Sequence, residues 1–301
     1  MKRPKADSTA QPESEEGLRL VLAPNPSPMT FQGTNTYILG RGEVVVIDPG
    51  PAIASHLEAI LSALAPGERV AAILVTHSHL DHSPLAKPLS ARTGAQILAA
   101  GPSNWGRSAR MTELAASGDV GGGEGVDADF SPHRQLEDGE TLEGGWGRIE
   151  TVATPGHMAN HLSFAWNGAL FPGDMVMAWS TSLVSPPDGD MTAFIASLAR
   201  LRARDDRVYY PGHGPPVDNP AARLDELIAH RRAREAQIRT ALGKLGAASA
   251  TDLAEAIYTD IDPALLPAAS RNVLAHLIDM EEKGEAMVEN GIRADSLFYL
   301  S

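Results

Sequence analysis

The stretch His77-Ser78-His79-Leu80-Asp81-His82 places four potential metal ligands within six positions. It follows a strongly apolar segment, residues 70–75, and the whole chain contains only ten histidines, so such a cluster is improbable by chance. Histidine nitrogen and carboxylate oxygen are ligands that zinc and other borderline divalent metals favour. The stretch therefore predicts a metal site, against the simpler interpretation of a histidine patch on the surface.

The composition of the 301-residue chain is that of a globular protein with a large core. Hydrophobic residues make up 43% of it, and no apolar run approaches the roughly 18 residues that a membrane span requires. The N-terminus is not followed by the apolar segment of a secretory signal. Residues 1–17 are mostly polar, so we expect a disordered tail there and a cytoplasmic location for the protein.

The chain has no cysteine, which excludes disulfides and thiolate metal ligands together. Any metal must then be held by His, Asp, Glu and water. The formal net charge of −13 argues against a surface that binds long nucleic acids, although a pair of metal ions would create a local positive site. We expect no membrane partner, and the sequence leaves a homo-oligomer open.

Short apolar or β-branched segments alternate with helical patterns in both halves of the chain. Strands are expected at residues 18–22, 36–39, 44–47, 70–75, 96–99, 149–152, 162–166, 169–171 and 208–210. Helices are expected at residues 53–64, 84–93, 192–204 and 220–244. Residues 101–136 break this rhythm with a glycine-rich run, which predicts an insertion or flexible loop, either passive or acting as a lid. The alternation predicts an α/β sandwich.

Residues 244–301 are expected to form a separate small unit. Helical patterns begin near Thr251 and at Pro263, and two short strand patterns flank the turn Asn290-Gly291. Helices followed by a hairpin resemble a winged helix, a shape that often binds DNA. The acidic residues around Glu281 favour a packing role for this unit instead.

Three further ligand-type residues come after predicted strands, and each directly follows a glycine. They are His157, Asp174 and His213. Open sheets place ligand sites at the carboxyl ends of strands, where loops converge and glycine permits tight turns. The strand ends would therefore gather seven side chains in one cleft: His77, His79, Asp81, His82, His157, Asp174 and His213.

With these residues in place, the chain resembles the metallo-β-lactamase superfamily from about residue 18 to residue 239. The central motif of that superfamily, His-x-His-x-Asp-His, stands at residues 77–82, and the later histidine, aspartate and histidine follow in the expected order. The resemblance implies an αββα sandwich over residues 18–243, with a dimetal site at one edge. One departure is Ser83-Pro84, because the family often carries glycine after the motif.

The resemblance also implies a role for each ligand residue. One metal would be held by His77, His79 and His157, the second by Asp81, His82 and His213, and Asp174 would bridge the two. Two zinc ions are expected, with iron or manganese as alternatives, and a water shared by the metals would attack the substrate as hydroxide. Asp81 and Asp174 are the expected catalytic carboxylates, with Asp81 orienting that hydroxide or accepting its proton.

The other histidines are expected to be structural or exposed to solvent: His56, His133, His230 and His276. His161 lies four residues after His157, so it could support a metal ligand, face the substrate or be an ordinary structural residue. Lys87 is expected at the surface. Five residues in turns are candidates either for lining the pocket or for ordinary packing: Asn35, Tyr37, Trp179, Ser180 and Ser182.

Within the superfamily, the sequence resembles the branch that contains glyoxalase II, lactonases and RNase Z. Nearly the whole chain is similar to the lactamase-β-like group, which has a winged-helix-like tail. A β-lactam hydrolase is disfavoured, because two of those groups use a cysteine ligand and a third lacks the bridging aspartate. The predicted function is hydrolysis of a small carbonyl compound, either an ester, a thioester or a lactone. The alternatives are an endoribonuclease acting on single-stranded RNA and a mono-iron sulfur dioxygenase.

Overall fold

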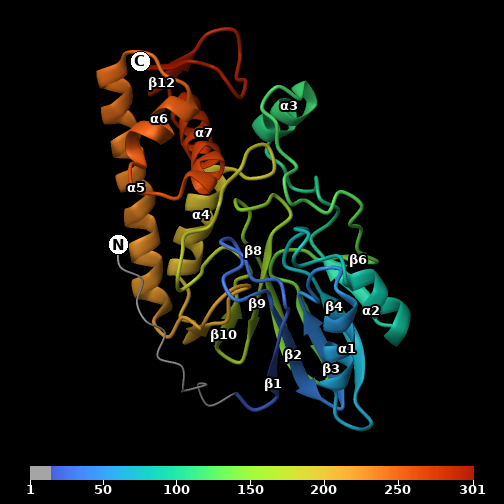
Figure 1. Cartoon of the computed structure of the whole chain (residues 1–301). Helices are drawn as coiled ribbons and strands as arrows, with labels where there is room; N and C mark the ends of the chain where they lie inside the picture. The colour runs from blue at the N-terminus through green and yellow to red at the C-terminus, as the bar shows by residue number, and fades with distance from the viewer. Residues whose placement is uncertain (1–14) are drawn as a thin grey trace.

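The computed structural model describes residues 15–301, and two facing sheets form its main part (Figure 1). The strands of the first sheet are β1 (Leu18–Leu22), β2 (Asn35–Arg41), β3 (Glu43–Ile47), β4 (Arg69–Leu74), β5 (Gln96–Ala99) and β6 (Arg134–Gln135), paired in that order. Those of the second are β7 (Thr141–Gly144), β8 (Gly147–Ala153), β9 (Leu162–Trp166), β10 (Ala169–Phe171) and β11 (Val208–Tyr209), also paired in order. The pairs β1·β2 and β2·β3 are antiparallel, whereas β3 to β6 run parallel.

Successive residues of the central strands point into different layers. In β3, Val45 and Ile47 belong to the core between the two sheets, whereas Val44 and Val46 pack toward the helices on the outer face. Those helices are α1 (Ala54–Ser62) and α2 (Ala86–Thr93). Because both faces of the strand are covered, its sequence is a continuous apolar run.

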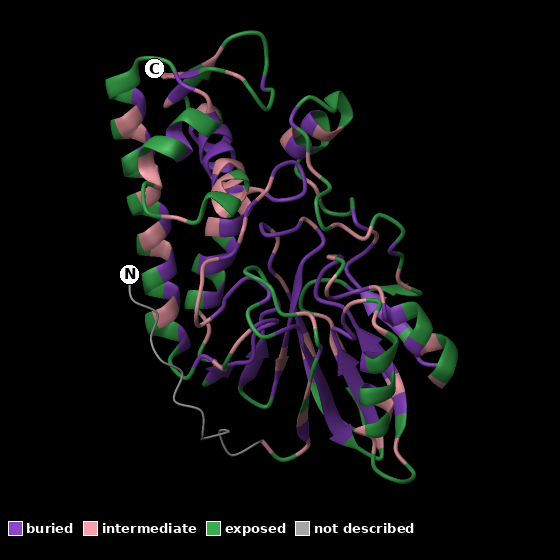
Figure 2. Cartoon of the chain, in the orientation of Figure 1, coloured by how far each residue is buried: buried purple, intermediate pink, exposed green. Residues whose placement is uncertain are grey.

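The second sheet is covered on its outer face by α4 (Met191–Arg202) and α5 (Pro220–Leu245), which share a buried cluster with β8, β10 and β11. The layers are therefore helix, sheet, sheet, helix, and the central strands β2, β3, β9 and β10 are mostly buried between them (Figure 2). This is the αββα sandwich that the sequence predicts.

The C-terminal unit is built on the last turns of α5. It comprises α6 (Ala250–Ile257), the 3₁₀ turn η1 (Pro263–Leu265), α7 (Leu266–Glu282) and the hairpin of β12 (Ala286–Val288) with β13 (Phe298–Leu300). Its core includes Leu253, Val273 and Phe298 together with Ile238 and Leu242 of α5. The predicted division after residue 243 falls inside α5, because that helix contributes to both units.

Residues 101–136 are more ordered than the sequence predicts. They contain a helix, α3 (Ala109–Ser117), which begins at Ser108, whose hydroxyl accepts a hydrogen bond from the Met111 amide. Met111, Leu114 and Val120 are buried in the core of the C-terminal unit. The prediction of a flexible loop was therefore wrong for this part of the segment, which docks onto a distant part of the chain.

Residues 1–14 of the predicted tail lie outside the described residues. Glu15, the first described residue, accepts hydrogen bonds from the side chains of Arg207 and Tyr210. Within residues 15–301, no helix combines the length and the apolar character needed to cross a membrane.

Candidate metal centre

The seven predicted ligands meet where four strands end. His77 follows β4, His157 follows β8, Asp174 follows β10 and His213 follows β11, each by three or four residues. The four strands lie in two different sheets, so the site sits across the edge of the sandwich. His79, Asp81 and His82 reach it from the short turn after His77.

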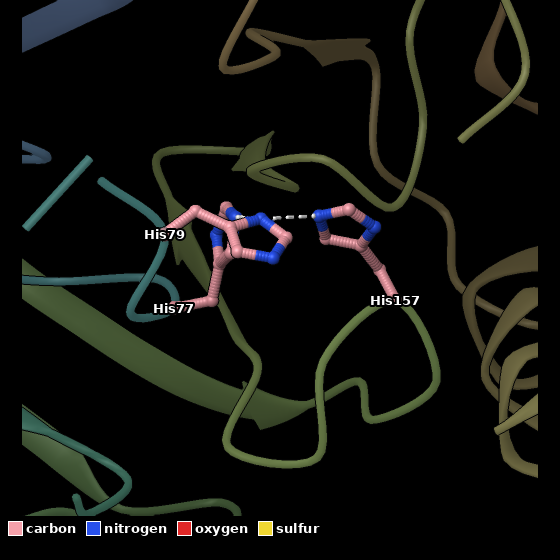
Figure 3. A group of neighbouring side chains, drawn as sticks. All are labelled: His77, His79 and His157. Carbon is pink, nitrogen blue, oxygen red and sulfur yellow. Dashed lines mark hydrogen bonds between the residues drawn. The ribbon is translucent and has the colours of Figure 1, made fainter. Parts of the chain in front are cut away.

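Three histidines form the first ligand group. The Nε2 atoms of His77 and His157 each lie 3.0 Å from Nδ1 of His79, and the rings point toward one another (Figure 3). Three nitrogens bound to one zinc at about 2.0–2.1 Å in tetrahedral geometry would be about 3.3 Å apart. The separation of these atoms is therefore close to that of three ligands of a single cation.

The second group combines a carboxylate with two histidines. Nε2 of His213 lies 3.1 Å from Oδ2 of Asp81 and 3.3 Å from Nε2 of His82. Asp174 lies between the two groups, with Oδ2 3.4 Å from His213 and 3.7 Å from His157. Its Oδ1 is buried and has no hydrogen-bond donor among the described residues, as expected of an oxygen that faces a cation.

Hydrogen bonds fix which ring nitrogen of each histidine is free to bind a metal. Nδ1 of His157 donates to the carbonyl of Leu183 (2.6 Å), and Nδ1 of His213 donates to that of Gly33 (3.1 Å). Because a carbonyl only accepts, both Nδ1 atoms carry a proton, which leaves Nε2 as the nitrogen of each ring that is directed at the centre. The same arrangement supports metal-binding histidines in general.

Asp48 supports two further ligands. Its Oδ2 accepts from Nδ1 of His82 (2.9 Å) and from the hydroxyl of Thr76 (2.7 Å). Since that hydroxyl donates to Asp48, it must accept from Nδ1 of His77 (2.9 Å), which leaves Nε2 of His77 unprotonated. Asp48 has a positive φ of 48°, a strained conformation that is typical of functional sites.

The electrostatics of the two groups differ. Burial and the neighbouring histidines lower the pKa of His77 and His79, the latter to about 3, so both rings are neutral and able to bind a metal. Burial also lowers the pKa of His213, but Asp174 and Asp81 outweigh it and raise that pKa to about 10. The carboxylates therefore make the second group a place that favours positive charge, and the donor set fits a pair of divalent cations.

Glycine is required where two loops pass the ligands. A Cβ atom on Gly212 would lie 2.5 Å from Oδ1 of Asp174 and 2.7 Å from a ring carbon of His82. On Gly173, which has a φ of +50°, it would lie 2.7 Å from both His161 and Thr76. The glycines before these ligands thus serve close approach as well as the turn.

Three of the five candidates for pocket lining hold loops instead. The amide of Asn35 donates to the carbonyls of Pro211 and Gly214 (both 2.9 Å), so it fixes the turn that carries His213. Tyr37 is buried between the sheets and also donates to Pro211 (2.8 Å), and buried Ser182 donates to the backbone of Asp174. Of the five, Trp179 and Ser180 do line the cleft.

His161 is buried behind the first ligand group. Its ring stacks on that of His77 at 5.0 Å, and its Nδ1 lies 2.9 Å from the hydroxyl of Thr154. It therefore supports a ligand rather than facing the cleft. The other histidines lie outside the seven-residue cluster: His56, His133, His230 and His276.

Two adjoining hollows, each of about 450 Å³, open beside the ligands. One contains Asp81, Asp174 and His213, with Trp179 and Met177 on its walls. The other reaches from His79 and His157 to the beginning of α7. They share six residues of their linings: Pro28, Met29, His79, Glu124, His157 and Leu183.

Comparison with known proteins agrees with this geometry. Residues 29–213 match the model of the Metallo-beta-lactamase superfamily, which covers more than half of the chain. The chain belongs to the metallo-beta-lactamase superfamily. Residues 249–292 match the Beta-lactamase associated winged helix domain. The predicted family and the predicted winged-helix-like tail are both confirmed, and the protein is a hydrolase of this superfamily.

Relatives of this superfamily member match it over most of its length. A Beta-lactamase-like protein 2 homolog of Drosophila melanogaster is 29% identical over 289 residues, 93% of this chain and 92% of that protein. An Atrochrysone carboxyl ACP thioesterase of Aspergillus fumigatus is 29% identical over 259 residues, 79% and 72% of the two chains.

Solved structures of other proteins share this fold. The crystal structure of a metallo-beta-lactamase family protein from Thermus thermophilus superposes with a TM-score of 0.76 at 26% identity, covering 95% of this chain and 99% of that one. Another, solved in a di-iron-bound form, has a TM-score of 0.50 at 27% identity and covers 66% of this chain and 96% of that one. Iron is therefore found in at least one structural relative of this chain.

Proposed function

We propose that this superfamily member hydrolyses a thioester of a small molecule, with two zinc ions held by the seven-residue cluster. His77, His79 and His157 would hold one ion, Asp81, His82 and His213 the other, and Asp174 would lie between them. The supporting observation is that each set of three side chains converges on one point with Asp174 beside both. When bound, the two cations would lower the pKa of a shared water and polarise the carbonyl of the substrate.

Asp81 is placed to orient the attacking water through a hydrogen bond. Its side chain is 27% exposed and lines the cleft, whereas that of Asp174 is 11% exposed. Burial raises the pKa of Asp81, but His82 and His213 outweigh it and lower that pKa to about 2. Asp81 is thus ionised at neutral pH, as a metal ligand and an acceptor of a hydrogen bond from the attacking water must be.

The lining of the cleft favours a substrate whose leaving group needs no proton. Among the described residues, neither hollow is lined by a lysine, a tyrosine or a histidine outside the cluster. A thiolate, with a conjugate pKa of about 8.5, leaves without help far more easily than a ribose alkoxide does. This favours a thioester over RNA, and the name of the Aspergillus fumigatus relative adds support.

Metal analysis followed by a substrate panel tests the proposal. Protein purified without added metal should contain two zinc ions per chain and should cleave an acyl thioester faster than an oxoester, a lactone or a single-stranded RNA. His77→Ala and Asp174→Ala should each lose metal and reduce thioester kcat/KM by at least about a hundredfold. His133→Ala, which changes an exposed histidine outside the cluster, is the matched control.

Three outcomes would count against the proposal. Preferential cleavage of RNA would favour an endoribonuclease. One iron per chain, together with oxidation of a persulfide, would favour a sulfur dioxygenase. Retention of both metal and activity in His77→Ala and Asp174→Ala would refute the ligand assignment itself.

A further inference from the structure

The second hollow is closed on one side by the winged-helix unit. Leu265, Ala268 and Arg271 line it, three residues apart along η1 and the first turns of α7. Residues at this spacing share one face of a helix. The other face of α7, which carries Val273 and Leu277, packs into the core of its own unit. One face of α7 therefore packs in the core of the C-terminal unit, and the face at its start lines the hollow.

The opposite wall of this hollow is also apolar. It comes from Pro28 and Met29 in the loop before β2, and from Leu183 in the loop after β10. Met29 is 47% exposed although it is a large apolar side chain. His79 and His157 lie in the same hollow, so the apolar walls are continuous with the proposed metal centre.

The charged groups of this hollow are largely engaged by the protein itself. The carboxylate of Asp188 forms an ion pair with Arg107 (2.5 Å) and accepts a hydrogen bond from the backbone N–H of Gly123 (2.7 Å). Arg271 donates from Nε to the hydroxyl of Ser185 (2.8 Å) and from Nη1 to the carbonyl of Val120. The third charged residue of the lining, Glu124, is a carboxylate and would repel an anion. The hollow is therefore suited to an uncharged apolar group rather than to an anion.

The segment after α3 fixes this wall relative to the ligands. At one end, the carbonyl of Gly125 accepts a hydrogen bond from the backbone N–H of Leu80 (2.7 Å). The carboxylate of Asp127 accepts one from the hydroxyl of Ser83 (2.7 Å), and Ser83 stands where the family often has glycine. At the other end, the carbonyl of Asp119 accepts a hydrogen bond from the backbone N–H of Ala294 in the C-terminal unit (3.0 Å). The segment thus connects the six-residue motif directly to the winged helix.

We propose that the winged-helix unit binds the acyl chain of the substrate, with Leu265 and Ala268 setting the size of chain that fits. The inference rests on the proposed thioester hydrolysis and names the substrate class, an uncharged straight-chain acyl thioester longer than acetyl. A hollow of about 450 Å³ is within the range that holds small ligands. Each buried methylene should raise kcat/KM by about fourfold until the hollow is filled.

The test measures kcat/KM for acetyl, butyryl, hexanoyl and octanoyl thioesters of N-acetylcysteamine, a carrier without charge. Wild type should prefer the longer chains. Ala268→Trp, which fills the hollow, should lower the octanoyl value by at least about tenfold and the acetyl value by less than about threefold. Leu265→Ala should move the preference to longer chains, and it keeps the test valid should Ala268→Trp fail to fold.

The control is Leu297→Ala, which removes an exposed side chain (56%) from the hairpin of the same unit. It should leave the chain-length profile unchanged. A flat profile in wild type, or the same profile in wild type, Ala268→Trp and Leu265→Ala, would overturn the inference while thioester hydrolysis stands.

A binding measurement separates this inference from the proposed function. S-octyl and S-ethyl thioethers of N-acetylcysteamine cannot be cleaved, and their affinity can be measured by calorimetry on the protein as purified. The octyl compound should bind wild type at least about tenfold more tightly than Ala268→Trp does. Equal affinities would refute the proposal that the winged-helix unit binds the acyl chain, whatever the hydrolysis assays show. Absence of thioester cleavage would refute only the proposed hydrolysis.

Discussion

Asp48 illustrates why single residues outside a motif can control a metal centre. It is 2% exposed, it is bonded to His82 directly, and it reaches His77 through Thr76. Asp48 directly follows an apolar strand and precedes Pro49-Gly50, whereas the ligands His157, Asp174 and His213 each directly follow a glycine. The sequence predicts only a turn at Asp48, because hydrogen bonds between side chains far apart in the chain leave no periodic pattern.

We expect Asp48→Asn to weaken metal binding without abolishing it. The amide keeps the shape of the side chain, but both carboxylate oxygens of Asp48 act as acceptors. Oδ2 accepts from the Thr76 hydroxyl and from His82, and Oδ1 accepts from the backbone N–H of Thr76 (2.7 Å), so the NH₂ group of asparagine must face at least one donor. The loss should be about ten- to a hundredfold in affinity, as is typical when the support of a ligand is removed. Competition with a chelator measures it, with exposed Asp129→Asn as the control. Equal affinities for Asp48→Asn and wild type would contradict the role of Asp48.

At the scale of elements, the apolar pattern of the sequence predicts the bounds of some strands correctly and misses other elements. β5, β9 and β10 match the expected residues, because their apolar side chains lie within a buried sheet. β1 also matches, although its apolar residues Leu20 and Leu22 are exposed. α3 was missed because its apolar residues Met111 and Leu114 pack against the C-terminal unit, a contact that no pattern around them reveals. β6 was missed because its two residues, Arg134 and Gln135, are exposed and polar.

The packing of α7 has a consequence for stability at low pH. His276 is 0% exposed, and neither of its ring nitrogens has a hydrogen-bond partner among the described residues. Burial, followed by the charges of Arg231 and Arg234, lowers its pKa to about 3. Below pH 6.5 the unfolded chain therefore takes up a proton that the folded chain refuses, so the free energy of unfolding falls as the pH falls from about 6.5 toward 3.

His276→Leu removes this loss, since leucine is of similar size and does not titrate. The variant should gain stability relative to wild type by about 2 kcal/mol between pH 7 and pH 5, which is about 1.4 kcal/mol for each pH unit below 6.5. Urea unfolding at both pH values measures the difference, with the exposed His133→Gln as the control. A difference between variant and wild type that does not change with pH would show that His276 takes up a proton in the folded chain as readily as in the unfolded chain.

At the scale of the molecule, the two units share both a helix and a bridging segment. Leu224 and Leu227 of α5 belong to the cluster under the second sheet, whereas Ile238 and Leu242 of the same helix belong to the C-terminal core. The segment after α3 connects the six-residue motif to the winged helix a second time. The sequence predicts both units, but it does not predict that the second one walls the cleft of the first, because that contact joins residues far apart in the chain.

This sharing predicts that the protein unfolds in one cooperative step although it has two cores. Leu198→Ala in the first unit and Leu242→Ala in the second remove fully buried side chains, at a cost of about 2–5 kcal/mol each. Each should lower one common melting midpoint by roughly 4–10 °C in chelator-treated protein, and exposed Leu297→Ala should not. Calorimetry should give equal calorimetric and van't Hoff enthalpies. A separate early transition in Leu242→Ala would mean that the winged helix melts alone, and a wall that melts alone could not hold a fixed acyl pocket.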